Sequence, residues 1–240
     1  AAEARCPGPP GGGPPKRRCV QALFFETTPE MRKLPPLNIL SNSFLELQHF
    51  FSQKFQFSLP NNTLVIHVRS GDIFSSDINP DYGQPPCRYY LDIIKMRNWS
   101  KIILISQDTA NPCVNILRNS TPKVEYTKQS LRKDLLILLN AEHIVMSRGS
   151  FIPAVIALSK KVRSVFSYNV HNHSILMAPI DERILDDFYR TRQISNINCV
   201  ANEQYRMDVL ANWTRSDYQL HLLKTAPACS QWEFYNKTAH

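Results

Sequence analysis

Short runs rich in β-branched residues alternate with amphipathic helical patterns through the middle of the chain. Five such runs are predicted to be strands, at 63–68, 101–106, 123–126, 143–147 and 162–167. Helical periodicity fills the intervals, at 87–97, 112–118, 130–141 and 151–159. Strands and helices that alternate at this spacing form right-handed βαβ units, which build a parallel sheet with helices on both faces. The sequence therefore predicts an α/β fold with a doubly wound, Rossmann-like parallel sheet.

The first predicted strand leads directly into a cation, a glycine and a carboxylate. Its uninterrupted apolar run is typical of a central strand covered on both faces. Ligands of open α/β sheets bind outside the carboxyl ends of the strands, where the guanidinium of Arg69 would offer a planar fork to phosphate oxygens. Gly71 permits a tight turn, and Asp72 can orient Arg69. The alternative is a strand that ends in a surface arginine and a turn-forming aspartate.

The rest of the chain is predicted to form smaller parts around one Rossmann-like domain over residues 61–180. Residues 1–18 are rich in Pro and Gly and are predicted to be a flexible stem. Residues 19–60 contain an amphipathic pattern over 42–55 and are predicted to form a shortened N-terminal part. Residues 181–240 are predicted to form C-terminal helices that pack on the sheet.

Cysteines and glycosylation motifs indicate an oxidising compartment. Six cysteines without Cys-x-x-Cys spacing favour disulfides over a zinc site. Fifteen pairings are possible, and Cys6 with Cys19 and Cys199 with Cys229 are the local pairings that we expect. Six Asn-x-Ser/Thr sequons begin at Asn61, Asn98, Asn119, Asn172, Asn212 and Asn236. No apolar run approaches the roughly 20 residues that span a bilayer. We expect a protein of the secretory pathway, in the Golgi lumen or secreted, whose leader or membrane anchor has been removed.

The charge of the chain is compatible with an anionic partner. The formal net charge is +8, but the densest basic run is only Lys16-Arg17-Arg18. A nucleic-acid-binding tail would need a longer block of Lys and Arg. We therefore expect an anionic small molecule rather than a nucleic acid as the partner.

Three segments resemble one enzyme family, in the same order along the chain. The segment 67–72, His-Val-Arg-Ser-Gly-Asp, resembles the His-x-Arg-x-x-Asp motif of the GDP-fucose-dependent fucosyltransferases, which include α-1,2-, α-1,6- and protein O-fucosyltransferases. The segment 134–151 resembles that family's block of an Asp, an apolar helix, an apolar strand and Ser-x-x-Ser-Phe. Ser-Gln-Asp at 106–108 is similar to its Ser-x-Asp. The matches span about residues 60–170.

The resemblance implies roles for individual residues. In that family the motif arginine contacts the β-phosphate of the donor and the motif aspartate supports the site, which implies these roles for Arg69 and Asp72. The Ser-x-x-Ser-Phe turn cradles the nucleotide, which implies Ser147, Ser150 and Phe151.

Other positions carry less defined expectations. The resemblance places Asp108 and Asp134 near the guanosine or its ribose. His67 shares a strand face with Arg69 and is either a hydrogen-bonded core histidine or a direct ligand. The base that accepts the acceptor proton would be Asp77 or Asp81, in the loop after the first strand, although loop aspartates are often turn formers.

Glycosyl transfer from a nucleotide sugar requires stabilisation of the departing diphosphate. A metal held by an Asp-x-Asp pair is one device, and this sequence contains no such pair. A guanidinium with a helix N-terminus is the other, so we expect chemistry without a metal or other cofactor, GDP-fucose being the donor substrate. Many family members carry a second arginine where this chain has Ser70, which leaves one cation fork here.

The resemblance implies an inverting fucosyltransferase with a GT-B-like fold that acts on a glycan acceptor. Two alternatives stay open. The donor could be another nucleotide sugar, or the chain could be a secreted, glycan-binding module of the same fold without turnover. The short segment ahead of the first strand favours the second alternative.

Overall fold

A computed structural model describes residues 49, 57–75, 78, 80–126, 128–149, 151–168 and 193–235. The strands are β1 (Thr63–His67), β2 (Lys101–Ile105), β3 (Val124–Tyr126), β4 (His143–Val145), β5 (Ser164–Tyr168), β6 (Ser195–Val200) and β7 (Gln231–Tyr235). The helices are α2 (Cys87–Met96), α3 (Pro112–Arg118), α4 (Leu131–Asn140), α5 (Phe151–Leu158), α7 (Glu203–Tyr205) and α8 (Asp217–Thr225). Two 3-10 helices, η3 (Gly71–Phe74) and η4 (Pro80–Tyr82), and a π-helix, η5 (Arg206–Leu210), complete the described elements.

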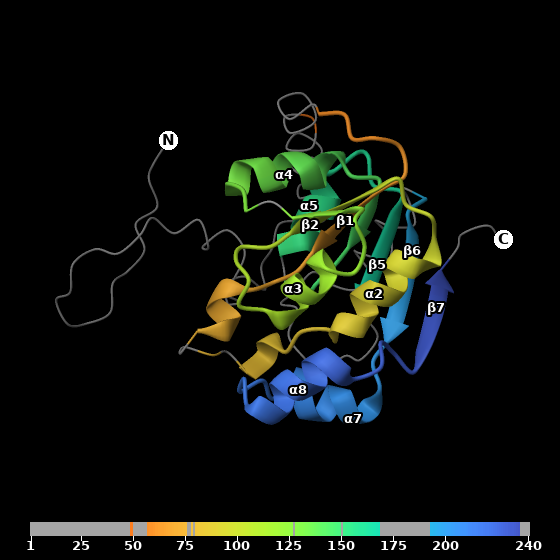
Figure 1. The fold of residues 1–240 in the computed structure, drawn as a ribbon. Coiled ribbons are helices and arrows are strands. Elements are labelled where there is room, and N and C mark those ends of the chain that lie inside the picture. The colour runs from red at the N-terminus through yellow and green to blue at the C-terminus, as the bar shows by residue number, and fades with distance from the viewer. Residues whose placement is uncertain are drawn as a thin grey trace, which may run out of the picture.

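Within the described residues the strands form one seven-stranded sheet in the order β3-β2-β1-β4-β5-β6-β7 (Figure 1). Strands β1 to β6 are parallel, and β7 pairs antiparallel with β6. The order of the first six strands is that of the doubly wound, Rossmann-type sheets. The predicted α/β fold with a largely parallel sheet is confirmed, and its topology is compatible with a Rossmann-like architecture.

Both faces of the sheet are covered, because successive side chains of the central strands enter different cores. Leu64 and Ile66 of β1 join the core beneath α2, α3 and α8, whereas Val65 joins the core beneath α4 and α5. All three side chains are fully buried, and each contributes about 1.5–3 kcal/mol by leaving water. The uninterrupted apolar sequence of β1 follows from this two-sided burial.

Local sequence signals determine where two helices begin. The Asn111 side chain accepts a hydrogen bond from the backbone N–H of Cys113, and Pro112 occupies the first turn of α3. Ser216 and Gln219 form a reciprocal capping box at the start of α8. The cap at Asn111 fixes the start of α3 immediately after β2, on the edge of the sheet where the predicted site lies.

The C-terminal region differs from its prediction. Residues 181–240 were predicted to be helices, but β6 and β7 also lie there and extend the sheet beyond β5. The described helices of this region are α7, η5 and α8. The prediction was therefore incomplete, because β6 is rich in asparagine and has no apolar run that would identify it as a strand.

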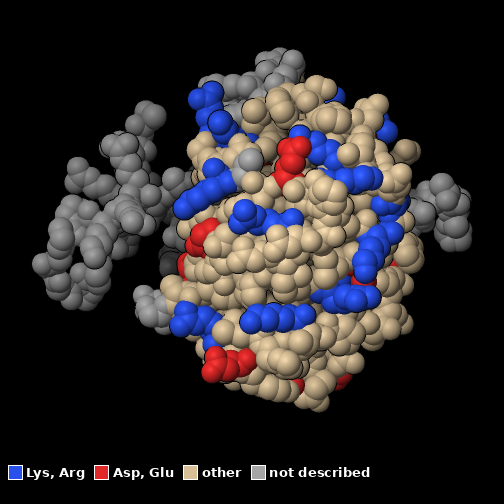
Figure 2. Space-filling model, in the orientation of Figure 1, with Lys and Arg blue, Asp and Glu red and all other residues tan. Residues whose placement is uncertain are grey.

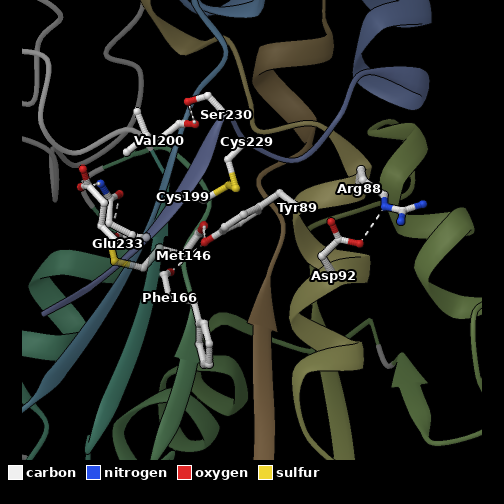
Figure 3. The surroundings of a disulfide bond; sticks show 12 residues. Arg88, Tyr89, Asp92, Met146, Phe166, Cys199, Val200, Cys229, Ser230 and Glu233 are labelled. Atoms are coloured by element: carbon white, nitrogen blue, oxygen red, sulfur yellow. Dashed lines mark hydrogen bonds and ion pairs between the residues drawn. A yellow bond between two sulfur atoms is a disulfide. The ribbon is translucent and has the colours of Figure 1, made fainter. Parts of the chain in front are cut away.

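Two disulfides join elements of the sheet and its helices. Cys87, at the start of α2, pairs with Cys113 in α3, and Cys199 in β6 pairs with Cys229 just before β7. Figure 3 shows the second bond beside Tyr89, whose hydroxyl donates to the carbonyl of Phe166 at 2.8 Å. The predicted Cys199–Cys229 pairing is confirmed, and two disulfides are compatible with a secreted or lumenal protein.

None of the helices in the described part of the chain is both long and apolar enough to traverse a bilayer. The predicted stem at 1–18 and the predicted Cys6–Cys19 pairing lie outside the described residues. The same holds for most of the predicted N-terminal part at 19–60, including the pattern over 42–55 apart from His49.

Lys and Arg side chains are spread over the face of the molecule that carries α2, α3 and α8 (Figure 2). On α2, Arg88 is exposed and forms an ion pair with Asp92 at 2.7 Å. Lys95 and Arg97, near the end of the same helix, are also exposed. The excess positive charge on this face is therefore carried by separate, solvated side chains.

Candidate functional site

His67, Arg69 and Ser147, three of the predicted site residues, lie where the strand order of the sheet reverses. Strand β1 pairs with β2 on one side and with β4 on the other. The chain leaves β1 toward α2 on one face and leaves β4 toward α5 on the opposite face. Ligands of open α/β sheets bind outside the carboxyl ends of the strands at this reversal. The ends of β1 and β4 are therefore the expected place for a ligand.

A hydrogen bond joins these two strand ends. The Nδ1 atom of His67, the last residue of β1, lies 2.7 Å from the Oγ atom of Ser147, which follows β4. The imidazole also contacts the ring of Phe151, the first residue of α5, with 5.6 Å between centroids. Burial, together with the nearby charge of Arg69, lowers the pKa of His67 to about 3. His67 is therefore a neutral, partly buried histidine that positions Ser147.

Arg69 is held by an ion pair and an aromatic ring. Its Nη2 group donates to Oδ2 of Asp72 at 3.0 Å, and its guanidinium carbon lies 4.1 Å from the ring centroid of Tyr82 in η4. The Arg69 side chain remains 22% exposed. Among the described residues, its Nε and Nη1 groups donate no hydrogen bond. The guanidinium therefore has a fixed direction and two nitrogens available to an anionic ligand.

The backbone of Gly149 lies directly against this guanidinium. Gly149 has φ of +139°, and a Cβ atom at this position would come within 2.8 Å of Nη1 of Arg69. Most side chains disfavour such a φ, so glycine is required both by the backbone and by the close approach of Arg69. The loop after β4 thus forms one wall around the arginine.

Asp108 supports the turn that carries Arg69, because one oxygen of its carboxylate accepts hydrogen bonds from that turn. Its Oδ1 atom accepts from the Ser70 hydroxyl, from the N–H of Gly71 at 3.2 Å and from the N–H of Ala110 at 2.9 Å. Burial alone would raise the pKa of Asp108, but these hydrogen bonds and the charge of Lys128 hold that pKa below its ordinary value. Asp108 is a charged clamp between the turn after β1 and the end of β2.

Asn111 adds a second link to the same turn. Its Nδ2 group donates to the carbonyl of Arg69 at 2.9 Å, and its N–H donates to the Ser70 hydroxyl at 2.8 Å. Asn111 was absent from the predicted site, although an Asn directly before Pro112 is a recognisable signal of a helix start. Ser70 is 3% exposed, and its hydroxyl donates to Asp108 within this clamp.

Arg148 is a half-buried cation that the prediction also missed. Its Nη1 group donates to the carbonyls of Gly83 at 3.2 Å and Leu210 at 3.0 Å. Burial lowers its pKa, and the nearby carboxylate of Asp81 opposes that shift. The guanidinium ties the loop after β1 to η5, so Arg148 is a structural support for Tyr82 and its neighbours. The sequence signal that could have identified Arg148 is its position inside the predicted turn at 147–151.

The remaining predicted residues are distributed differently. Asp134 lies in the first turn of α4, and its Oδ1 atom is buried without a hydrogen-bond partner among the described residues. Burial raises the pKa of this carboxyl group. No hydrogen bond links Asp134 to the other site residues in the described part of the chain. Asp77 and Ser150 lie outside the described residues.

In the described part of the chain, no group of three or more His, Cys, Asp and Glu side chains is arranged to hold a metal ion. Comparison of the chain with protein-family models, curated proteins and solved structures finds no match.

Proposed function

We propose that this chain is a glycosyltransferase that moves L-fucose from GDP-fucose to a glycan hydroxyl, with inversion and without a metal ion. The observation that carries the proposal is the environment of Arg69. Its guanidinium stands at the reversal point of the sheet, is oriented by Asp72 and Tyr82, and keeps two nitrogens without a protein partner among the described residues. Such an arrangement suits the binding of a diphosphate.

The proposed reaction breaks the bond between C1 of fucose and the diphosphate oxygen and forms a bond from the acceptor oxygen to C1. Arg69 would donate to the β-phosphate and stabilise the negative charge that GDP gains as it leaves. The acceptor proton would pass to a carboxylate of the loop after β1, for which Asp77 stays the proposed base. Ser147, Ser150 and Phe151 would line the nucleotide side, at the start of α5.

The proposal extends to the architecture and the compartment. The described sheet would be the donor-binding half of a GT-B-like fold preceded by a shortened N-terminal part. Lumenal placement in the Golgi, or secretion, would supply both the oxidising conditions for the two disulfides and the glycan acceptors.

A second candidate is a module that binds a nucleotide sugar or a glycan without turnover. Asp72 already pairs with Arg69, and Asp108 already accepts three protein hydrogen bonds. Neither of these two motif carboxylates is therefore an unengaged base for an acceptor hydroxyl, which favours binding without catalysis.

A thermal-shift panel tests the donor site directly. GDP, UDP, ADP and CMP would each be added, with EDTA present, to the unchanged protein, to Arg69→Ala and to Arg88→Ala. Arg88 is the control, because it is an exposed arginine in a surface ion pair on α2. A ligand at 100 times its Kd stabilises by about 2.7 kcal/mol. We expect GDP alone to raise Tm, equally for Arg88→Ala and not for Arg69→Ala.

Stabilisation by UDP, ADP or CMP instead of GDP would mean that the donor is a sugar linked to that other nucleotide. No shift with any nucleotide would reject the donor site. If GDP binds, two assays separate the two candidates. The first measures release of free fucose from GDP-fucose, and the second uses chromatography to detect fucosylated products after incubation with glycan acceptors. A transferase forms a fucosylated product that is lost in Arg69→Ala, whereas the binding module forms none.

A further inference from the structure

Three of the glycosylation sequons converge on one edge of the sheet. Asn61, Asn98 and Asn119 stand just ahead of β1, β2 and β3, respectively. These three strands are neighbours in the sheet and run parallel. Their starting ends therefore lie together, on the edge opposite the carboxyl ends that carry Arg69.

Hydrogen bonds tie the segments that bear these asparagines to one another. The Nδ2 group of Asn62 donates to the carbonyl of Asn98 at 2.8 Å, and the Ser100 hydroxyl donates to the carbonyl of Asn61. Lys123 follows the third sequon, and its Nζ group donates to Oδ1 of Asn98 at 2.6 Å. The three acceptors thus belong to one continuous surface.

Each of the three asparagines is exposed, whereas a neighbour of each of the first two is buried. Thr63 is 3% exposed and Trp99 is 1% exposed, so the core fixes the chain just after Asn61 and Asn98. Asn61, Asn98 and Asn119 themselves lie in the exposed class, in turns and at the C-terminal cap of α3. A bulky hydrophilic group attached to them would extend into solvent without displacing packed atoms.

We propose that Asn61, Asn98 and Asn119 carry N-linked glycans, which make this edge of the sheet a glycan-covered face. The donor would be an oligosaccharide linked to a lipid diphosphate. Its C1–oxygen bond breaks, a bond forms between C1 and the asparagine Nδ2 atom, and one amide proton leaves with the lipid diphosphate. Oδ1 of Asn98 remains an acceptor after the reaction, so the Lys123–Asn98 hydrogen bond is compatible with the modification.

Two independent features of the fold support the proposal. The disulfides Cys87–Cys113 and Cys199–Cys229 form in the same oxidising compartments in which N-glycosylation occurs. Among the described strands, β3 is an outer strand of the sheet, and outer strands carry unpaired backbone groups that invite association with other chains. A glycan at Asn119 would shield that strand. The proposal is independent of the proposed enzymatic function.

The fourth sequon that the structure describes lies away from this face. Asn212 is exposed between η5 and α8, and Asn172 and Asn236 lie outside the described residues. Among the described sequons, the glycan-covered face therefore comprises three positions, on the edge of the sheet opposite the carboxyl ends of β1 and β4.

Site-resolved mass spectrometry tests the proposal. The full chain would be secreted from a eukaryotic cell behind a cleavable leader, and its two disulfides would be mapped to establish that it has folded. Peptide N-glycosidase in heavy-oxygen water converts each glycosylated asparagine into labelled aspartate. We expect the label at Asn61, Asn98 and Asn119. An unlabelled asparagine at any of the three positions in the folded protein would overturn the proposal.

Matched variants give a second readout by gel mobility. Asn119→Gln and Thr121→Ala both destroy the third sequon, the latter without changing the asparagine, and each should remove one glycan. Asn115→Gln is the control, because Asn115 is an exposed asparagine of α3 outside any sequon. Loss of a glycan in Asn115→Gln, or equal mobility of all four proteins, would contradict the assignment at Asn119.

Discussion

The Nδ1 atom of His67 lies 2.7 Å from the Oγ atom of Ser147, and this contact joins the two strands between which the sheet reverses its order. The histidine is neutral, since burial and Arg69 lower its pKa to about 3. A protonated ring would place a second cation beside Arg69 in a poorly hydrated position. The neutral ring therefore keeps β1 and β4 together while leaving Arg69 as the cation of this edge.

His67 should make the fold sensitive to mild acid. The unfolded histidine binds a proton near its ordinary pKa of 6.5, whereas the folded one does so only near 3. The unfolded state thus holds more protons between these values, and stability falls as the pH falls through this window, by up to about 1.4 kcal/mol per pH unit. Denaturant unfolding of the unchanged protein and of His67→Gln, between about pH 7 and pH 4, measures it. Parallel curves for the two proteins would reject this role.

Gly149 and Arg69 should be energetically coupled. Gly149→Ala brings a Cβ atom against Nη1 of Arg69 and also strains the backbone at φ of +139°. We expect a loss of about 1–3 kcal/mol of stability. In the Arg69→Ala background only the backbone strain remains, so the same change should cost less. A double-mutant cycle from unfolding curves gives the difference, and strictly additive effects would show that the contact has no energetic weight.

Asp108 should matter more for stability than Asp92, a half-buried aspartate whose side chain forms a surface ion pair with Arg88. Asp108→Ala leaves the Ser70 hydroxyl and the N–H groups of Gly71 and Ala110 without their acceptor, which should cost about 3 kcal/mol. Asp92→Ala breaks only a surface ion pair with Arg88 and should cost less than about 1 kcal/mol. Chemical denaturation of both variants measures the two losses in unfolding free energy. Equal losses would show that the hydrogen bonds to Asp108 do not stabilise the fold.

The Cys87–Cys113 disulfide should stabilise the fold substantially. The two cysteines are 26 residues apart, and closing a loop of this length restricts the unfolded chain by about 3.5 kcal/mol. The paired variant Cys87→Ala/Cys113→Ala should lose this amount in denaturant unfolding without reductant. A loss well below 1 kcal/mol would indicate that the unfolded chain is already restricted there.

The aromatic support of Arg69 should be visible in ligand affinity. Tyr82→Phe keeps the ring beneath the guanidinium, whereas Tyr82→Leu removes it and should weaken GDP binding by about 0.5–1 kcal/mol. Arg69→Lys keeps the charge but loses the planar fork, and about a tenfold weaker affinity is expected. Isothermal titration with GDP measures all three. Unchanged affinity in Arg69→Lys would mean that charge alone is sufficient.

The sequence predicted the parts of the fold where local and global signals agree. Strand β1 and helix α2 have uniform apolar or amphipathic patterns and were predicted closely. Strand β6 was missed because Asn196 and Asn198 occupy buried positions in it, which asparagine rarely does. Both are accommodated by partners distant in sequence, Ser167 and, for Asn198, also Glu233. Such compensation has no local sequence signature.

The candidate site shows the same division. The pairing of Arg69 with Asp72 is a contact between residues three positions apart, so a motif could suggest it. The ring of Tyr82 and the backbone of Gly149 meet Arg69 only through the arrangement of two loops that follow different strands. Asp108 can accept its hydrogen bonds from Ser70 and Gly71 only because of the register in which β1 pairs with β2. These relationships required the tertiary structure.

The close approach of Gly149 to Arg69 also restricts how this chain could have diverged. A lineage that acquired a side chain at position 149 would have to move or replace the arginine at position 69, since both cannot occupy the same space. In a lineage that first lost the arginine, the steric conflict at position 149 would disappear, and only the φ of +139° would still favour glycine there. The two positions should therefore change together among descendants of a common ancestor, although 80 positions separate them in the chain.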